Sequence, residues 1–154
     1  MRRFLDATLP TRGSALLLLC GFAAGCDDEA PAQDFPLVEQ VVVGADHACA
    51  LFFSGLVKCW GENASGQLGR LDVYRSAEAL PVLGGAVSLS AGKGVTCAVT
   101  RDVGTWCWGS GNVAGEELTY SEPQQVSLPG AREIHFSLQG GCALTVAGTV
   151  QCWI

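Results

Sequence analysis

CALFFSGLVKCW, residues 49–60, returns twice along the chain, as CAVTRDVGTWCW at residues 97–108 and as CALTVAGTVQCW at residues 142–153. In each copy nine residues separate the two cysteines, and a tryptophan follows the second cysteine. The copies start 48 and then 45 residues apart, and a period of this size is typical of solenoids and propellers. The sequence therefore predicts an array of one supersecondary unit.

The composition indicates an all-β globular protein. Hydrophobic residues make up 49% of the 154 residues and charged residues 16%, as in ordinary globular domains. Twenty glycines against one methionine indicate many turns and little helix, because glycine weakens helix interiors and serves turns and bulges.

The first 25 residues have the features of an export signal. Three arginines precede a short apolar run, which is well under the ~20 residues that a membrane-spanning helix needs. Residues 23–26, Ala-Ala-Gly-Cys, resemble the lipobox of bacterial lipoproteins, so Cys26 is the expected site of lipid attachment and the first mature residue. The alternative is a signal peptide cleaved elsewhere. Residues 26–36 are acidic and contain two prolines, and we expect them to form a tether.

The charge of the remaining chain disfavours a nucleic-acid partner. Without residues 1–25, six lysines and arginines face fourteen aspartates and glutamates, a formal charge of −8. Non-specific affinity for nucleic acids comes mainly from lysines and arginines that release counterions, and no basic cluster is present to do this. We therefore expect no binding to nucleic acids.

Each repeat can be placed on a β-hairpin. If Cys49 lies opposite Cys59, the connecting loop is residues 53–55, and Gly55 takes the third position, where a left-handed residue is required. The third repeat predicts the same geometry with Gly148, whereas the second repeat predicts a five-residue loop. An apolar strand is expected to open every unit, at residues 41–43, 87–89 and 134–136.

The cysteines are predicted to form one disulfide within each hairpin. Directly opposed residues of an antiparallel pair lie within disulfide range, and an exported chain meets an oxidising compartment. The predicted pairs are Cys49–Cys59, Cys97–Cys107 and Cys142–Cys152. Zinc is the competing interpretation, but a nine-residue gap is not a usual ligand spacing, and His47 and His135 occupy unrelated repeat positions. No metal site is predicted.

Residues 44–69, GADHACALFFSGLVKCWGENASGQLG, resemble the regulator-of-chromosome-condensation repeat in the cysteine-bearing form common in exported bacterial proteins. The resemblance includes the histidine, the Cys-Ala-Leu strand, the glycine turn, Cys-Trp-Gly, the asparagine and Gly-Gln-Leu-Gly. It extends over residues 37–154, although the second repeat has Val95 at the histidine position and the third has Gly140.

The resemblance implies a propeller of four-stranded antiparallel blades, typically seven, around a central channel. The chain holds about two and a third blades, in units at residues 37–86, 87–131 and 132–154, the last truncated. We expect a fragment of a seven-bladed propeller. Unclosed blades leave exposed sheet edges, so self-association is a further expectation.

Signals for an enzyme are poor, and no cofactor is predicted. The sequence has no phosphate-binding glycine loop and no serine in a nucleophile elbow. The histidine of the Asp46-His47 pair is interpreted as a blade residue, and the sequon at Asn63 as part of the repeat rather than a glycosylation site. The repeated tryptophans, Trp60, Trp108 and Trp153, are interpreted as packing residues rather than as a carbohydrate-stacking row.

The predicted function is a binding scaffold without catalytic activity. Family members act as binding platforms, among them nucleotide exchangers for small GTPases and protein inhibitors, and the fold does not decide between such roles. We expect a lipid-anchored protein of the bacterial cell envelope, periplasmic or on the outer surface, with a protein or another cell-surface macromolecule as partner. The alternatives are an inhibitor of a secreted enzyme and a truncated gene product without independent function.

Overall fold

The computed structural model describes residues 37–102, 104–137 and 140–154, which belong to a unit spanning residues 34–154. The expected export signal, Cys26 and the tether lie outside the described residues. All regular elements of the described ranges are strands, and none of these ranges contains a helix that could cross a membrane.

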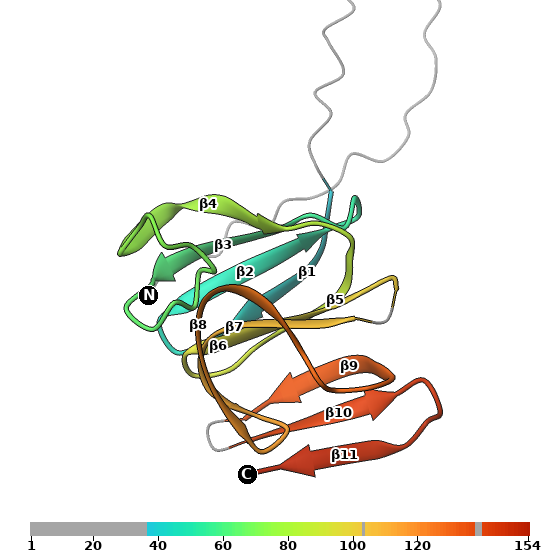
Figure 1. The fold of residues 1–154 in the computed structure, drawn as a ribbon. Coiled ribbons are helices and arrows are strands. Elements are labelled where there is room, and N and C mark those ends of the chain that lie inside the picture. The colour runs from blue at the N-terminus through green and yellow to red at the C-terminus, as the bar shows by residue number, and fades with distance from the viewer. Residues whose placement is uncertain (1–36, 103, 138–139) are drawn as a thin grey trace, which may run out of the picture. The chain divides into compact units, whose positions relative to one another are not determined.

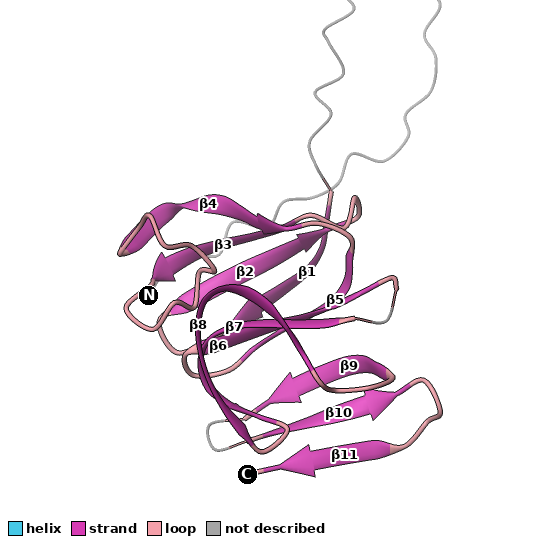
Figure 2. Cartoon of the chain, in the orientation of Figure 1, coloured by secondary structure: helices cyan, strands magenta, loops and turns pink. Residues whose placement is uncertain are grey.

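Within the described ranges eleven strands form three antiparallel sheets, in which neighbours in sequence are neighbours in space (Figures 1 and 2). Blade 1 comprises β1 (Val38–Val43), β2 (His47–Phe52), β3 (Val57–Glu62) and β4 (Arg75–Leu83). Blade 2 comprises β5 (Ala86–Ala91), β6 (Val95–Thr100), β7 (Thr105–Val113) and β8 (Glu116–Val126). Blade 3 comprises β9 (Ala131–Phe136), β10 (Gly141–Thr145) and β11 (Val150–Trp153).

This architecture confirms the predicted all-β partial propeller. Two blades have four strands, and the third has three, because β9 pairs with the β10–β11 hairpin. The opening strands of blades 2 and 3 begin at Ala86 and Ala131, one residue before the expected unit boundaries.

The hairpin register is the predicted one in all three blades. Each first cysteine lies directly opposite its second, at Cys49 and Cys59, at Cys97 and Cys107, and at Cys142 and Cys152. Gly55 and Gly148 close their three-residue loops with φ of 85° and 78°, the left-handed region that favours glycine. The second hairpin differs from the prediction of a five-residue loop. Val99 faces Thr105 as Leu51 faces Val57, and the N–H of Thr100 donates to the carbonyl of Gly104 over 2.9 Å, so its loop also has three residues.

The core lies between the blades, and the sheet of blade 2 uses its two faces for different neighbours. Cys49 and Leu51 of blade 1 share a buried apolar cluster with Ala98 and Trp108 of blade 2. Cys97, the residue before Ala98, belongs instead to a second cluster, which blade 2 shares with blade 3. Successive side chains of a strand point to opposite faces, so β6 is buried along its whole length.

The outermost strands of blades 1 and 2 each contain a proline, Pro81 in β4 and Pro123 in β8. Proline has no N–H to donate to a strand ladder, so it is confined to edge strands and discourages pairing with further strands. The prolines thus protect the two longest free edges of the array.

Candidate functional site: the junction of blades 1 and 2 and its clefts

In blades 1 and 2 the disulfide lies in the buried apolar cluster that the blade shares with the following blade. The structure bonds all three predicted cysteine pairs, with Cα atoms 4.0 to 4.1 Å apart. The pairs of blades 1 and 2 are completely buried. In blade 3, Cys142 is half-buried and Cys152 is exposed. The third disulfide is therefore the one within reach of solvent.

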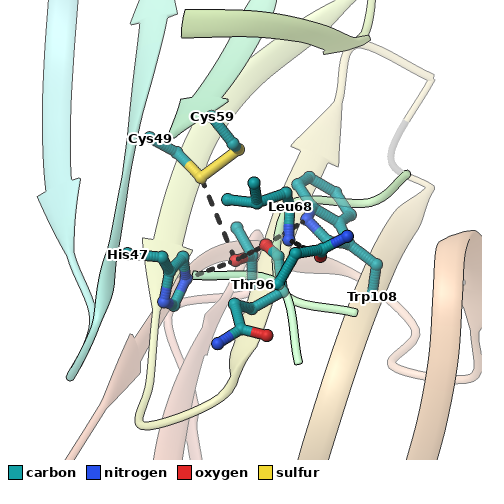
Figure 3. The surroundings of a disulfide bond; sticks show 8 residues. His47, Cys49, Cys59, Leu68, Thr96 and Trp108 are labelled. Carbon is teal, nitrogen blue, oxygen red and sulfur yellow. Dashed lines mark hydrogen bonds between the residues drawn. A yellow bond between two sulfur atoms is a disulfide. The ribbon is translucent and has the colours of Figure 1, made fainter. Parts of the chain in front are cut away.

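A hydrogen-bonded chain joins blade 1 to blade 2 beside the first disulfide (Figure 3). Thr96 Oγ1 lies 2.8 Å from His47 Nε2 and donates to the carbonyl of Gln67 over 3.1 Å. Trp108 Nε1 donates to the same carbonyl over 2.9 Å. Since the single hydroxyl proton of Thr96 is directed at Gln67, the Nε2 atom of His47 must carry the proton that it shares with Thr96.

The other ring nitrogen of His47 is left without a partner. His47 is only 4% exposed, and its Nδ1 atom has no hydrogen-bond partner among the described residues. Burial lowers the pKa of His47 from 6.5 to about 4, and the nearby carboxylate of Asp46 opposes this only in part. The imidazole is therefore neutral near pH 7 and acts as a structural donor, in agreement with its interpretation as a blade residue.

Two of the three tryptophans that follow a second cysteine donate hydrogen bonds from one blade to another. Trp108 Nε1 donates to the Gln67 carbonyl of blade 1, and Trp153 Nε1 donates to the Asn112 carbonyl of blade 2 over 3.0 Å. Both rings are buried, which confirms their interpretation as packing residues, whereas Trp60 is half-buried. In both junctions an indole of one blade therefore donates to a backbone carbonyl of the blade before it.

Asn63 fixes the long loop that follows β3. Its side-chain amide nitrogen donates to the carbonyls of Arg70 and Val73 over 2.7 and 2.6 Å, and its oxygen accepts from the N–H of Leu68 over 2.8 Å. Asn63 is 7% exposed. Three hydrogen bonds and burial leave its amide inaccessible for glycosylation and give it a role in the repeat.

Two clefts open beside this junction. The larger, of about 600 Å³, lies between the loop of residues 63–74 and the β7–β8 ribbon of blade 2. The second, of about 350 Å³, is lined by residues of all three blades, including Asp46, Lys93 and Phe136. In the described part of the chain no group of three or more histidines, cysteines and carboxylates is placed to hold a metal ion.

Sequence reasoning singled out His47 but missed Gln67 and Thr96 as its network partners. Thr96 occupies the position that Ala48 has in the first repeat and Gly141 in the third. A threonine where the other repeats have alanine and glycine is the feature of the sequence that could have indicated its role. The contact joins residues 49 positions apart, and only the packing of the two blades shows it.

Comparison with known proteins identifies the repeat. Residues 38–67 match the family model "Regulator of chromosome condensation (RCC1) repeat". The chain carries an RCC1 repeat. The match covers β1, β2, β3 and the beginning of the loop held by Asn63.

Solved structures, among them yeast RCC1 (Prp20), have a similar fold. Human WBSCR16 is similar with a TM-score of 0.68 and 24% identity, over 79% of this chain and 34% of that protein. The crystal structure of Kap60 bound to yeast RCC1 (Prp20) gives a TM-score of 0.62 and 17% identity, over 75% of this chain and 32% of the matched chain. The structure of Prp20p from Saccharomyces cerevisiae was described together with its binding to Gsp1p and histones. It gives a TM-score of 0.59 and 21% identity, over 75% of this chain and 32% of that protein. The chain thus spans about a third of the length of these structures.

Proposed function

We propose that this chain is the propeller portion of an exported, lipid-anchored protein of the bacterial cell envelope, which binds another macromolecule and performs no chemistry. The observation that carries this proposal is the set of three disulfides, one in each consecutive blade. Disulfides persist in exported and periplasmic proteins and are rare in the cytosol, where thiols are kept reduced.

The N-terminal sequence supports a lipid anchor. Basic residues, a short apolar run and Ala-Ala-Gly-Cys follow one another in the order that a lipoprotein signal requires, with Cys26 as the acylated residue. The acidic tether of residues 26–36 would then hold the propeller at the membrane surface.

The surface supports a binding role. The formal charge of −8 after residue 25 disfavours nucleic acids, so the proposed partner is a protein or another envelope macromolecule. The loop of residues 63–74 is held rigidly by Asn63 and yet exposes two large apolar side chains, Leu71 and Tyr74. Apolar groups presented on a fixed loop are typical of interaction sites, because their burial by a partner costs little ordering.

Fractionation of cells tests the anchor. The control is a Cys20→Ala variant, which changes a cysteine within the signal. Both the wild-type protein and this control are expected to incorporate labelled fatty acid and to be found in the membrane fraction. Cys26→Ala is expected to lose the label and to leave the membrane or remain unprocessed. A Cys26→Ala protein that stays with membranes at the wild-type size would refute lipid anchoring at this residue.

A further inference from the structure

A row of hydroxyl groups lines the larger cleft. The cleft, which we call the hydroxyl cleft, has a volume of about 600 Å³. Its lining includes Ser65, Leu71, Tyr74, Ser110, Thr119 and Ser121. A volume of this size lies within the range of small-molecule sites, roughly 300 to 1,000 Å³.

The row follows from the register of blade 2. Ser110 of β7 lies directly opposite Thr119 of β8, and Ser121 follows two residues later, on the same face of the ribbon. This is the face of β7 that carries Trp108, so it is turned toward blade 1. Near Trp108 this face is buried against blade 1. At Ser110, Thr119 and Ser121 the same face presents hydroxyl groups to the hydroxyl cleft.

The hydroxyls are free to bind a ligand. Ser65, Ser110, Thr119 and Ser121 are all exposed. None of their hydroxyl groups makes a hydrogen bond to another described residue. Such groups present both donors and acceptors to whatever enters the cleft.

The opposite wall is rigid and carries an aromatic ring. Tyr74 is 73% exposed and Leu71 is 71% exposed, on the loop that Asn63 holds in place. At Gly66 the loop touches β8 so closely that a Cβ atom there would lie 2.8 Å from Ser121 Cα. The two walls are therefore fixed relative to each other before any ligand binds, which reduces the entropic cost of binding.

The charges in the cleft cancel. Among the described residues that line it, Arg70 and Asp72 are the only charged ones, and they pair through two hydrogen bonds of 2.8 and 2.6 Å. No uncompensated cation is therefore present among the lining residues to attract a phosphate or a sulfate. The lining instead suits an uncharged ligand with many hydroxyl groups and one apolar face.

From this chemistry we propose that the hydroxyl cleft binds a neutral saccharide. The ring of Tyr74 covers the apolar face of a sugar ring, and the hydroxyls of Ser110, Thr119 and Ser121 exchange hydrogen bonds with the sugar hydroxyls. The assignment rests on the proposed binding role and names the ligand class of that scaffold.

A glycan array with the full-length, disulfide-bonded chain provides the first test. The probes are neutral oligosaccharides of hexoses and N-acetylhexosamines, with sialylated, sulfated and phosphorylated glycans for comparison. Calorimetry with the strongest neutral binder then gives Kd. We expect binding of a neutral glycan; an array without any neutral binder, or with acidic glycans only, would overturn the proposal.

Three variants locate the binding. Tyr74→Ala and Thr119→Val each remove one contact and are expected to raise Kd about fivefold to tenfold. Tyr120→Ala is the matched control, since Tyr120 is exposed but points to the other face of β8, and it is expected to leave Kd unchanged. All three side chains are exposed, so unchanged melting temperatures are expected and would exclude misfolding. A Kd that neither Tyr74→Ala nor Thr119→Val changes would place the sugar elsewhere and refute the assignment.

Failure of the saccharide site is distinguishable from failure of the proposed function. Cys26→Ala removes the anchor in cells but leaves the hydroxyl cleft intact, so the purified variant is expected to bind the glycan with the wild-type Kd. Glycan binding without membrane association of the wild type would contradict only the envelope assignment. Membrane association without glycan binding would contradict only the saccharide site.

Discussion

Acidification is expected to destabilise the junction of blades 1 and 2 through His47. Above pH 6.5 the imidazole is neutral in both the folded and the unfolded chain. In the folded protein burial lowers the pKa of His47 to about 4, so between these two values the unfolded chain binds a proton that the folded chain does not. The free energy of unfolding therefore falls as the pH drops from 6.5 to 4, and His47 contributes no further change below 4.

The size of this effect follows from the shift. One pKa unit corresponds to about 1.36 kcal/mol, so the loss is roughly 3 kcal/mol over this pH range. That is a large fraction of the total stability of a domain, which is of the order of 5 to 15 kcal/mol. Physically, a proton on Nδ1 would be a buried donor without an acceptor, next to the chain of hydrogen bonds through Thr96.

Urea denaturation of the wild type, His47→Gln and His135→Gln between pH 4 and 7.5 measures the effect. A glutamine amide can still donate to Thr96 but does not titrate, so the His47→Gln protein is expected to be less stable at pH 7 but to lose about 3 kcal/mol less on acidification. His135 is exposed, and its replacement serves as the control for the loss of a histidine. Identical pH dependence in the wild type and His47→Gln would show that His47 does not cause the loss of stability on acidification.

Three further predictions concern packing and redox stability. Gly44→Ala places a Cβ against the imidazole of the junction and 2.5 Å from a carbonyl oxygen, so a loss of about 1–3 kcal/mol in urea titrations is expected. Gly84→Ala meets nothing within 4 Å and is expected to be neutral. Trp108→Phe removes an interblade hydrogen bond and is expected to lower the melting temperature, with a loss of stability of at least ~1 kcal/mol. On titration with dithiothreitol, alkylation and mass spectrometry are expected to find Cys142 and Cys152 reduced before the buried cysteines; simultaneous reduction of all three pairs would contradict this order.

The fold was predictable because its information is local and repeated. The spacing from Cys49 to Cys59 implies a hairpin, Gly55 implies its loop, and the period implies stacked copies. The hairpin and its loop depend on residues at most ten positions apart, and the period appears as similarity between copies of one motif, so a single sequence reveals all three.

The junction and the cleft were not predictable because they depend on how two sheets face each other. Thr96 meets His47 across 49 residues, and the wall formed by Tyr74 faces Thr119 across a similar distance in sequence. A serine or threonine on a strand has no local signature that distinguishes a solvated edge from a binding cleft. Blade packing decides this, and it is a tertiary property.

The proposed export and the blade register both depend on the pairing of the cysteines in the protein isolated from the cell envelope. Peptide mapping without reduction measures it, since trypsin cuts at Lys58 and Arg101 within the first two hairpins and chymotrypsin at Leu144 within the third. The predicted result is three disulfide-linked peptide pairs: Cys49 with Cys59, Cys97 with Cys107, and Cys142 with Cys152. Free thiols at these positions, or a disulfide that joins two different blades, would contradict both the exported location and the blade register on which the proposed binding sites rest.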